Sequence, residues 1–117
     1  MALNHAESGD IIDVRPLGNK LSNSISTALF KTPSLEVMRM VLPVGRNVPE
    51  HSVQGEMTIQ CIEGAIELHA HQKTQALHAG DLVWLAGHVS HTLHALENTS
   101  LLVTISLRHD EDASSSA

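Results

Sequence analysis

The feature that most constrains this chain is a succession of short apolar segments, roughly ten residues apart, with glycine, proline or asparagine between them. Within several segments apolar residues recur at every second position, which is the period of a β-strand. No stretch sustains the 3.6-residue period of a helix, although residues 14–26 could hold one helical turn. The pattern predicts an all-β sandwich or barrel. The expected strands are 27–31, 35–42, 57–63, 65–71, 74–78, 82–85, 91–96 and 101–107.

The segment 35–42 is mostly apolar on both of its faces. Leu35, Val37, Arg39 and Val41 share one face, while Glu36, Met38, Met40 and Leu42 share the other. A strand of this kind is expected to be covered on both sides. If the face of Met38, Met40 and Leu42 were left open, it would form an apolar patch that needs a partner, so we expect a homodimer.

Length and composition set the outer limits. The chain has 117 residues, 42% of them hydrophobic, which suits a single domain with one modest core. We expect a flexible segment at 1–10, one domain at 11–107, and a disordered acidic and Ser/Ala-rich tail at 108–117. Phe30 and Trp84 are the only aromatic residues and the net charge is −6. Neither a stacking surface for bases nor a basic stripe is present, which argues against nucleic acid and anionic membranes as partners.

The sequence gives no sign of secretion. Cys61 is the only cysteine, so a disulfide framework is absent. No apolar run reaches the roughly 20 residues of a membrane span, and the start of the chain lacks a charged-then-apolar signal pattern. The expected location is the cytoplasm.

Histidine is unusually frequent, with nine in the chain and seven of them between positions 51 and 94. Imidazole is the commonest metal ligand near neutral pH, so this clustering raises a metal hypothesis. His69 and His71 alternate with apolar residues on their strand. We therefore expect them, like His78 and His94, to face solvent or a subunit contact.

Two motifs in the central segment resemble the cupin family. The first is Gly, five residues, His-x-His, three or four residues, Glu, six residues, Gly. This chain matches it at Gly45, His51 and Gly64, with Pro49 before the histidine, but it has Val53 and Met57 at the other two positions. The second is Gly, five residues, Pro-x-Gly, two residues, His, three residues, Asn. This chain matches it at Gly80 and His91, with Ala86, His88 and Ala95 at the remaining positions.

The resemblance covers residues 45–95, and the flanking strands are similar to the rest of a cupin. It implies a jelly-roll β-barrel of two antiparallel sheets, of the RmlC-like type found among small single-domain bacterial cupins. In metal-bearing cupins, two histidines and a Glu or Gln of the first motif join one histidine of the second around a divalent metal such as Fe, Mn, Ni, Cu or Zn. By that resemblance His51 and His91 are the candidate ligands, while Val53 cannot bind a metal and Met57 offers only a thioether, which suits Cu(I) better than Fe(II), Mn(II) or Zn(II).

Other side chains could complete the set. Glu56 lies one position before the Glu slot, where a β-bulge could turn it inward, and His88 lies on a turn three residues before His91. Gln60 alternates away from Met57 and should point outward. Cys61 shares the face of Met57, so it is either a buried small hydrophobe or part of a thiolate, thioether and imidazole copper site. Trp84 either lines the barrel or makes a dimer contact.

Two functions remain open. The first is a non-catalytic module that binds a small molecule in a mainly apolar barrel, with or without a weak metal site. The second is a metal-dependent enzyme of dioxygenase or isomerase type that uses His51, His91 and a further ligand such as Glu56 or His88. A metal-free variant of the second would use His91 for acid–base work.

Overall fold

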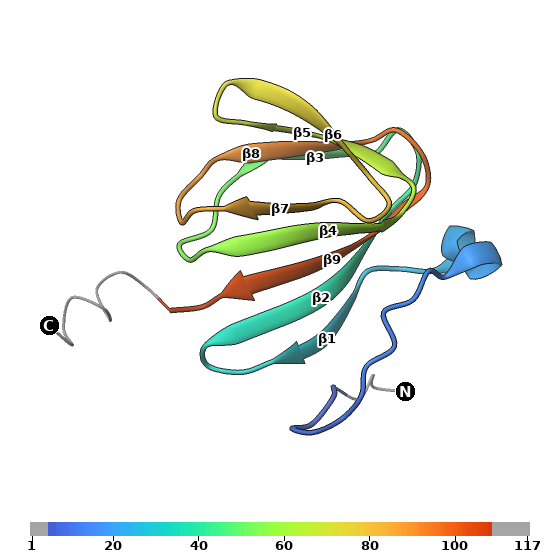
Figure 1. The fold of residues 1–117 in the computed structure, drawn as a ribbon, viewed down its shortest axis with the longest axis vertical. Coiled ribbons are helices and arrows are strands. Elements are labelled where there is room, and N and C mark those ends of the chain that lie inside the picture. Colours follow the sequence, from blue (N-terminus) through green and yellow to red (C-terminus); the bar gives the residue numbers. More distant parts are fainter. Residues whose placement is uncertain (1–4, 109–117) are drawn as a thin grey trace, which may run out of the picture.

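The computed structural model describes residues 5–108, which fold into two antiparallel sheets (Figure 1). A single 3₁₀ helix, η1 (Gly18–Asn23), precedes the strands. The strands are β1 (Thr27–Lys31), β2 (Leu35–Leu42), β3 (Asn47–His51), β4 (Met57–Glu63), β5 (Ala65–Ala70), β6 (Lys73–His78), β7 (Leu82–Leu85), β8 (His91–Ala95) and β9 (Thr99–Ser106). The all-β class predicted from the sequence is confirmed.

The two sheets have different sizes and share one core. The larger has the strand order β1-β2-β9-β4-β7 and the smaller has the order β3-β8-β5-β6. Because consecutive strands β2 and β3, and again β7 and β8, lie in different sheets, the chain crosses between layers as a jelly roll does. The core between the sheets is aliphatic, with Ile59, Ile66, Leu68, Leu101 and Val103 almost fully buried.

Half of the predicted strands are found with the expected ends and the others with ends shifted by one or two residues, but one strand was missed. Strand β3 has a proline and alternates poorly, because most of its side chains are exposed at the edge of the smaller sheet. The turn between β5 and β6 is formed by His71 and Gln72. Both residues have positive φ, 53° and 63°, as a tight hairpin turn requires.

The face of β2 that carries Met38, Met40 and Leu42 is covered, as expected for a strand that is apolar on both sides. Leu42 belongs to the core, and Met38 and Met40 pack against it. That face therefore needs no partner, and it gives no support to a homodimer, which stays a prediction. The exposed large apolar side chains of the larger sheet are instead on β7, where Leu82 and Trp84 are 64% and 60% exposed.

A buried polar network fastens the N-terminal segment to the outer side of the larger sheet. The Glu63 carboxylate accepts hydrogen bonds from the backbone N–H groups of Leu17 and Gly18 and from the Ser100 hydroxyl. The guanidinium of Arg39, which is 7% exposed, donates to Ser100 and to the carbonyls of Asp13 and Arg15. Burial raises the pKa of Glu63, but these bonds outweigh burial and hold that pKa below its usual value.

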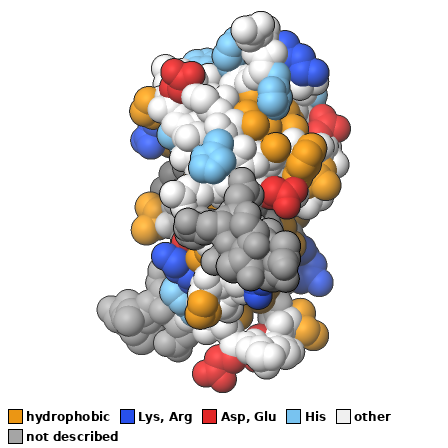
Figure 2. All heavy atoms as spheres, turned by 90° about the vertical axis from the view of Figure 1, so that its left-hand side faces the viewer, with side chains coloured by type: hydrophobic (Ala, Val, Ile, Leu, Met, Phe, Trp, Pro, Cys, Tyr) orange, Lys and Arg blue, Asp and Glu red, His pale blue; other side chains and the backbone are white. Residues whose placement is uncertain are grey.

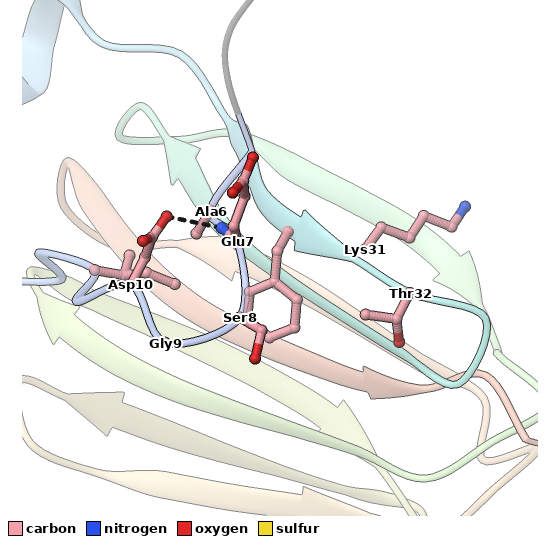
Figure 3. A pocket seen from close by; sticks show the side chains of 9 residues that line it. Ala6, Glu7, Ser8, Gly9, Asp10, Lys31 and Thr32 are labelled. Atoms are coloured by element: carbon pink, nitrogen blue, oxygen red, sulfur yellow. Dashed lines mark hydrogen bonds between the residues drawn. The ribbon is translucent and has the colours of Figure 1, made fainter.

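The first residues of the described segment also enclose a hollow on the outside of the barrel. It has a volume of about 280 Å³, and its walls come from residues 6–10, Ile12 and the end of β1 from Phe30 to Thr32. Figure 3 shows the turn that forms one wall, closed by a hydrogen bond from the Glu7 N–H to the Asp10 carboxylate. The segment 5–10 is therefore held at Ala6, whose N–H bonds to the Leu29 carbonyl.

Two further expectations can be placed against the described residues. No helix among residues 5–108 is long and apolar enough to cross a membrane. Most of the tail predicted to be disordered, residues 109–117, lies outside the described residues.

The Glu63 network predicts a specific loss of stability. Glu63→Gln removes the charge from three hydrogen bonds, and each such bond to a charged group contributes about 1.5–3 kcal/mol, so we expect the variant to lose at least ~1.5 kcal/mol of unfolding free energy at pH 7. Urea unfolding would measure this, with the exposed Glu97→Gln as the matched control.

The pH dependence of that loss follows from the lowered pKa. Stability supplied by a carboxylate with a depressed pKa is present above its unfolded value of about 4.5 and is lost as the pH falls through the folded value. The difference between wild type and Glu63→Gln should therefore shrink in acid. An equal difference at pH 7 and at pH 3 would contradict the role given to the charge.

Candidate functional site

The two motifs lie at the same end of the barrel. Strand β3 ends at His51 and β4 begins at Met57, while β7 ends at Leu85 and β8 begins at His91. Both connections cross between the sheets at the same end, on the left of Figure 1. We call this end, defined by His51, Met57, Leu85 and His91, the mouth. Figure 2 views the molecule from this side and shows histidine side chains gathered over its upper part.

Strand pairing brings the two candidate ligands together. In the ladder between β3 and β8, His51 lies directly opposite His91, after a register shift that follows Val48. The two imidazole ring centroids are 4.3 Å apart and the rings are tilted by 52°. His91 is 1% exposed, whereas His51 is exposed to solvent, so the pair reaches from the barrel interior to its surface.

Each ring is held by a bond to the backbone two residues earlier. His51 Nδ1 lies 3.0 Å from the Pro49 carbonyl oxygen, and His91 Nδ1 lies 3.0 Å from the Val89 carbonyl oxygen. Because a carbonyl can only accept, Nδ1 must carry the proton in both rings. Both Nε2 atoms are then left with a lone pair when the rings are neutral, and neither ring can donate to the other.

The buried member of the pair is left incomplete. His91 Nε2 is buried and has no hydrogen-bond partner among the described residues. Burial lowers the pKa of His91, and the neighbouring His51 lowers it further, while the bond to Val89 acts in the opposite direction. His91 is therefore neutral at neutral pH, and its Nε2 is an acceptor without a donor. Such an atom costs about 1–3 kcal/mol unless something satisfies it.

The two sulfur-bearing candidates, Met57 and Cys61, lie at different positions along β4. Met57 is 6% exposed and belongs to the core at the mouth, at the first position of β4. Cys61 is also buried and inward, as predicted. It lies four residues further along β4 than Met57, and its thiol contacts the carbonyls of Glu63 and Gly64. Burial raises the pKa of Cys61, which keeps it a thiol. A site that joins this cysteine to the histidine pair is therefore not supported.

The other proposed ligands do not join the pair. Glu56 is exposed, and its carboxylate accepts a hydrogen bond of 2.8 Å from the Trp84 indole N–H. Trp84 itself alternates with inward Val83 and Leu85, so it does not line the barrel. His88 is exposed, with a positive φ of 65° where the family motif has glycine. Gln60 alternates with buried Ile59 and Cys61 and faces outward, as the sequence predicted.

The remaining central histidines lie on the outer side of the smaller sheet, as expected. His69, His71 and His78 are exposed, and His94 is half-buried. His69 bonds to the Thr74 hydroxyl and His94 to the Asn47 side chain. In each of these two rings Nδ1 has a side-chain partner, and neither contact indicates a second binding site.

One polar residue near the mouth was not proposed from the sequence. Glu36 lies opposite Ile105 in the β2–β9 ladder, and Ile105 packs against the core, so Glu36 is on the barrel side of its strand. It lines an open hollow of about 290 Å³ whose other walls are Val53, Gln54, Gly55, Ile105, Ser106 and Leu107. The two-residue period that it shares with Met38 and Met40 could have revealed it.

The donor groups at the mouth do not fit a hard divalent metal. Within residues 5–108 no three His, Cys, Asp or Glu side chains lie close enough together to hold an ion. Fe(II), Mn(II) and Zn(II) sites are built from several imidazoles and carboxylates, and here two imidazoles stand without a carboxylate. Val53 packs against the core where a second histidine of the first motif would be.

Known proteins with this architecture come from several sources. A cupin-superfamily protein from Desulfitobacterium hafniense is 16% identical with a TM-score of 0.73, covering 88% of this chain and 100% of its own. The structure of KdgF from Halomonas sp. is 25% identical with a TM-score of 0.64, covering 74% and 81%. A salicylate 1,2-dioxygenase from Pseudaminobacter salicylatoxidans is 24% identical with a TM-score of 0.58, covering 62% of this chain but 21% of its own.

Sequence comparison gives the family directly. No curated protein sequence matches the chain significantly. The family model described as "Cupin domain" matches residues 38–106, which is more than half of the chain and includes the whole mouth. Together with the two-sheet jelly roll and the histidines at both motif positions, this match shows that the chain belongs to the cupin family.

Proposed function

We propose that this cupin is a binding module that takes a small molecule with O–H or N–H donors at the mouth of its barrel. The observation that carries the proposal is the buried Nε2 of His91, which has no hydrogen-bond partner among residues 5–108 and belongs to a ring whose centroid is 4.3 Å from that of His51. A bound donor would remove the cost of that atom. Met57 and Val53, at the other two positions of the first motif, lie in or against the apolar core, and small-molecule sites commonly combine apolar walls with a few polar groups that fix orientation.

The polar groups of the site favour donors over anions. With Nδ1 protonated, the Nε2 atom of a neutral His51 or His91 ring accepts a hydrogen bond, and the Glu36 carboxylate, in the hollow that Val53 and Gly55 also line, accepts as well. A carboxylate or phosphate ligand would bring a further negative charge to this acceptor-rich end of an acidic chain. The expected ligand is therefore uncharged or cationic and partly apolar.

A metal-dependent enzyme is the less supported candidate. It would need Glu56 or His88 as a further ligand, and the structure places both on the outside. The salicylate dioxygenase is similar in fold but matches only 21% of its own length, so its chemistry is not carried over to this chain.

A matched series of probes would test the proposal. Phenol has an O–H donor, anisole has the same ring without the donor, and benzoate carries a charge. Titrated into metal-free protein at pH 7.5 and followed by amide NMR shifts near Val53 and Gly55, phenol should bind roughly 3- to 10-fold more tightly than anisole, the worth of one net hydrogen bond. Benzoate should bind least.

The variants locate the effect. His91→Phe, checked for folding by its NMR spectrum, should remove the advantage of phenol over anisole, whereas the outer-face variant His69→Phe should keep it. The proposal is wrong if benzoate binds as tightly as phenol, if none of the three probes binds, or if the advantage survives in His91→Phe.

Titration of His91 gives an independent prediction. Because burial lowers its pKa, NMR titration should find its midpoint below the ordinary value of 6.5. The unfolded chain then binds a proton more readily than the folded one, so stability should fall as the pH drops from 6.5 through the folded midpoint. Urea unfolding at several pH values would show this, and His91→Phe should lack that part of the slope. A midpoint above 6.5 would contradict the buried neutral ring.

A further inference from the structure

The hollow beside Glu36 is lined by a single charged side chain, and that side chain is acidic. Its walls come from Glu36 on β2, from residues 53–55 in the loop between β3 and β4, and from residues 105–107 at the end of β9. We propose that this hollow binds the ammonium group of a small organic amine, with the Glu36 carboxylate as its counter-ion.

The Glu36 carboxylate takes part in none of the ion pairs found among residues 5–108. Lys31 lies opposite Glu36 in the β1–β2 ladder, but it is exposed and forms no ion pair with it. Arg108, which follows the last residue that lines the hollow, is exposed as well. Because a carboxylate is charged at neutral pH, Glu36 leaves the hollow with a negative charge that a bound cation would compensate.

The other walls of the hollow suit a small molecule with an apolar body. Val53 and Ile105 pack against the core, and Leu107 adds a further apolar side chain. Gln54 and Ser106 contribute an amide and a hydroxyl, whose oxygens can accept hydrogen bonds. An ammonium group has three N–H donors, which is enough for the carboxylate and both of these oxygens. The volume of about 290 Å³ is close to the lower end of the range for small-molecule pockets, about 300–1,000 Å³.

Backbone contacts between the loop and the end of β9 hold these walls in place. The Ser106 N–H donates to the Glu56 carbonyl at 2.9 Å, and the Leu107 N–H donates to the Ser34 carbonyl at 3.0 Å. Gly55 lies so close to β9 that a Cβ at its position would run into the Ser106 carbonyl oxygen. The hollow therefore exists before any ligand arrives, and binding needs little ordering of its walls.

The groups around the hollow favour an organic cation over a metal ion. Calcium and magnesium take six or more oxygen ligands, whereas the hollow offers one carboxylate. Within residues 5–108 no three His, Cys, Asp or Glu side chains lie close enough together to hold an ion. An amine needs only the one counter-ion, and its hydrocarbon part can cover Val53, Ile105 and Leu107. The expected ligand is a primary amine with a small apolar body.

A pair of probes that differ only in charge would test the proposal. Benzylamine carries an ammonium group at pH 7.5, and benzyl alcohol has nearly the same shape without the charge. In NMR titrations of the full chain, benzylamine should shift the amide signals of Ser106 and Leu107. It should bind about fivefold more tightly than benzyl alcohol, the worth of a partly screened ion pair, and raising the salt concentration should reduce that advantage.

Charge-removing variants locate the counter-ion. Glu36→Gln keeps the size of the side chain and should abolish the advantage of benzylamine, whereas the exposed Glu97→Gln removes the same charge elsewhere and should keep it. Lys31→Met removes the cation opposite Glu36, so it should bind benzylamine at least as tightly as wild type. The proposal is overturned if wild type binds benzylamine no better than benzyl alcohol, if the advantage survives in Glu36→Gln, if Glu97→Gln loses it equally, or if Lys31→Met binds benzylamine more weakly.

The amine site and the proposed function fail separately, because the amine site depends on Glu36 and not on His91. His91→Phe should lose the advantage of phenol over anisole and keep that of benzylamine over benzyl alcohol. Glu36→Gln, checked for folding by its NMR spectrum, should show the reverse. Loss of the benzylamine advantage in His91→Phe would overturn a separate amine site.

Discussion

The hydrogen bonds that two backbone carbonyls accept from His51 and His91 determine which ring nitrogens remain available at the mouth of the barrel. By accepting the Nδ1 protons of His51 and His91, Pro49 and Val89 leave two imidazoles side by side, each with a lone pair and neither with a proton to share. Burial then keeps the inner ring neutral. Among residues 5–108, His91 Nε2 at the mouth is consequently an acceptor that no donor satisfies. A ligand with O–H or N–H groups satisfies that arrangement.

The histidine pair depends on the pairing of the edge strand β3 with β8 in the smaller sheet. His51 ends the exposed edge strand β3 and His91 begins β8, so the pair forms only if these strands meet in the observed register. Gly87 helps to close the adjoining loop, since a Cβ at that position would run into the Gln54 carbonyl oxygen. Far from the mouth, the network of Glu63, Arg39 and Ser100 fastens the N-terminal segment to the larger sheet.

Sequence patterns predicted much of this and missed the rest for physical reasons. Two-residue alternation and turn residues identified most strands, because burial on one face imposes that period. Strand β3 escaped because an edge strand with Pro49 and exposed side chains buries too little to alternate. The motif register predicted that His51 and His91 belong together. It could not predict their tautomers, the outward bond of Glu56 to Trp84, or the hollow beside Glu36, since these depend on where the loops run.

The central claim is that both histidines present Nε2 lone pairs, and nitrogen NMR of the imidazole rings tests it most directly. In metal-free protein at pH 7.5, ¹⁵N-labelled histidine spectra should show a protonated Nδ1 and an unprotonated Nε2 for both His51 and His91, with assignments made from His51→Phe and His91→Phe. A proton on Nε2 of either ring would contradict the account, because that ring could then donate to the other and the pair would satisfy itself.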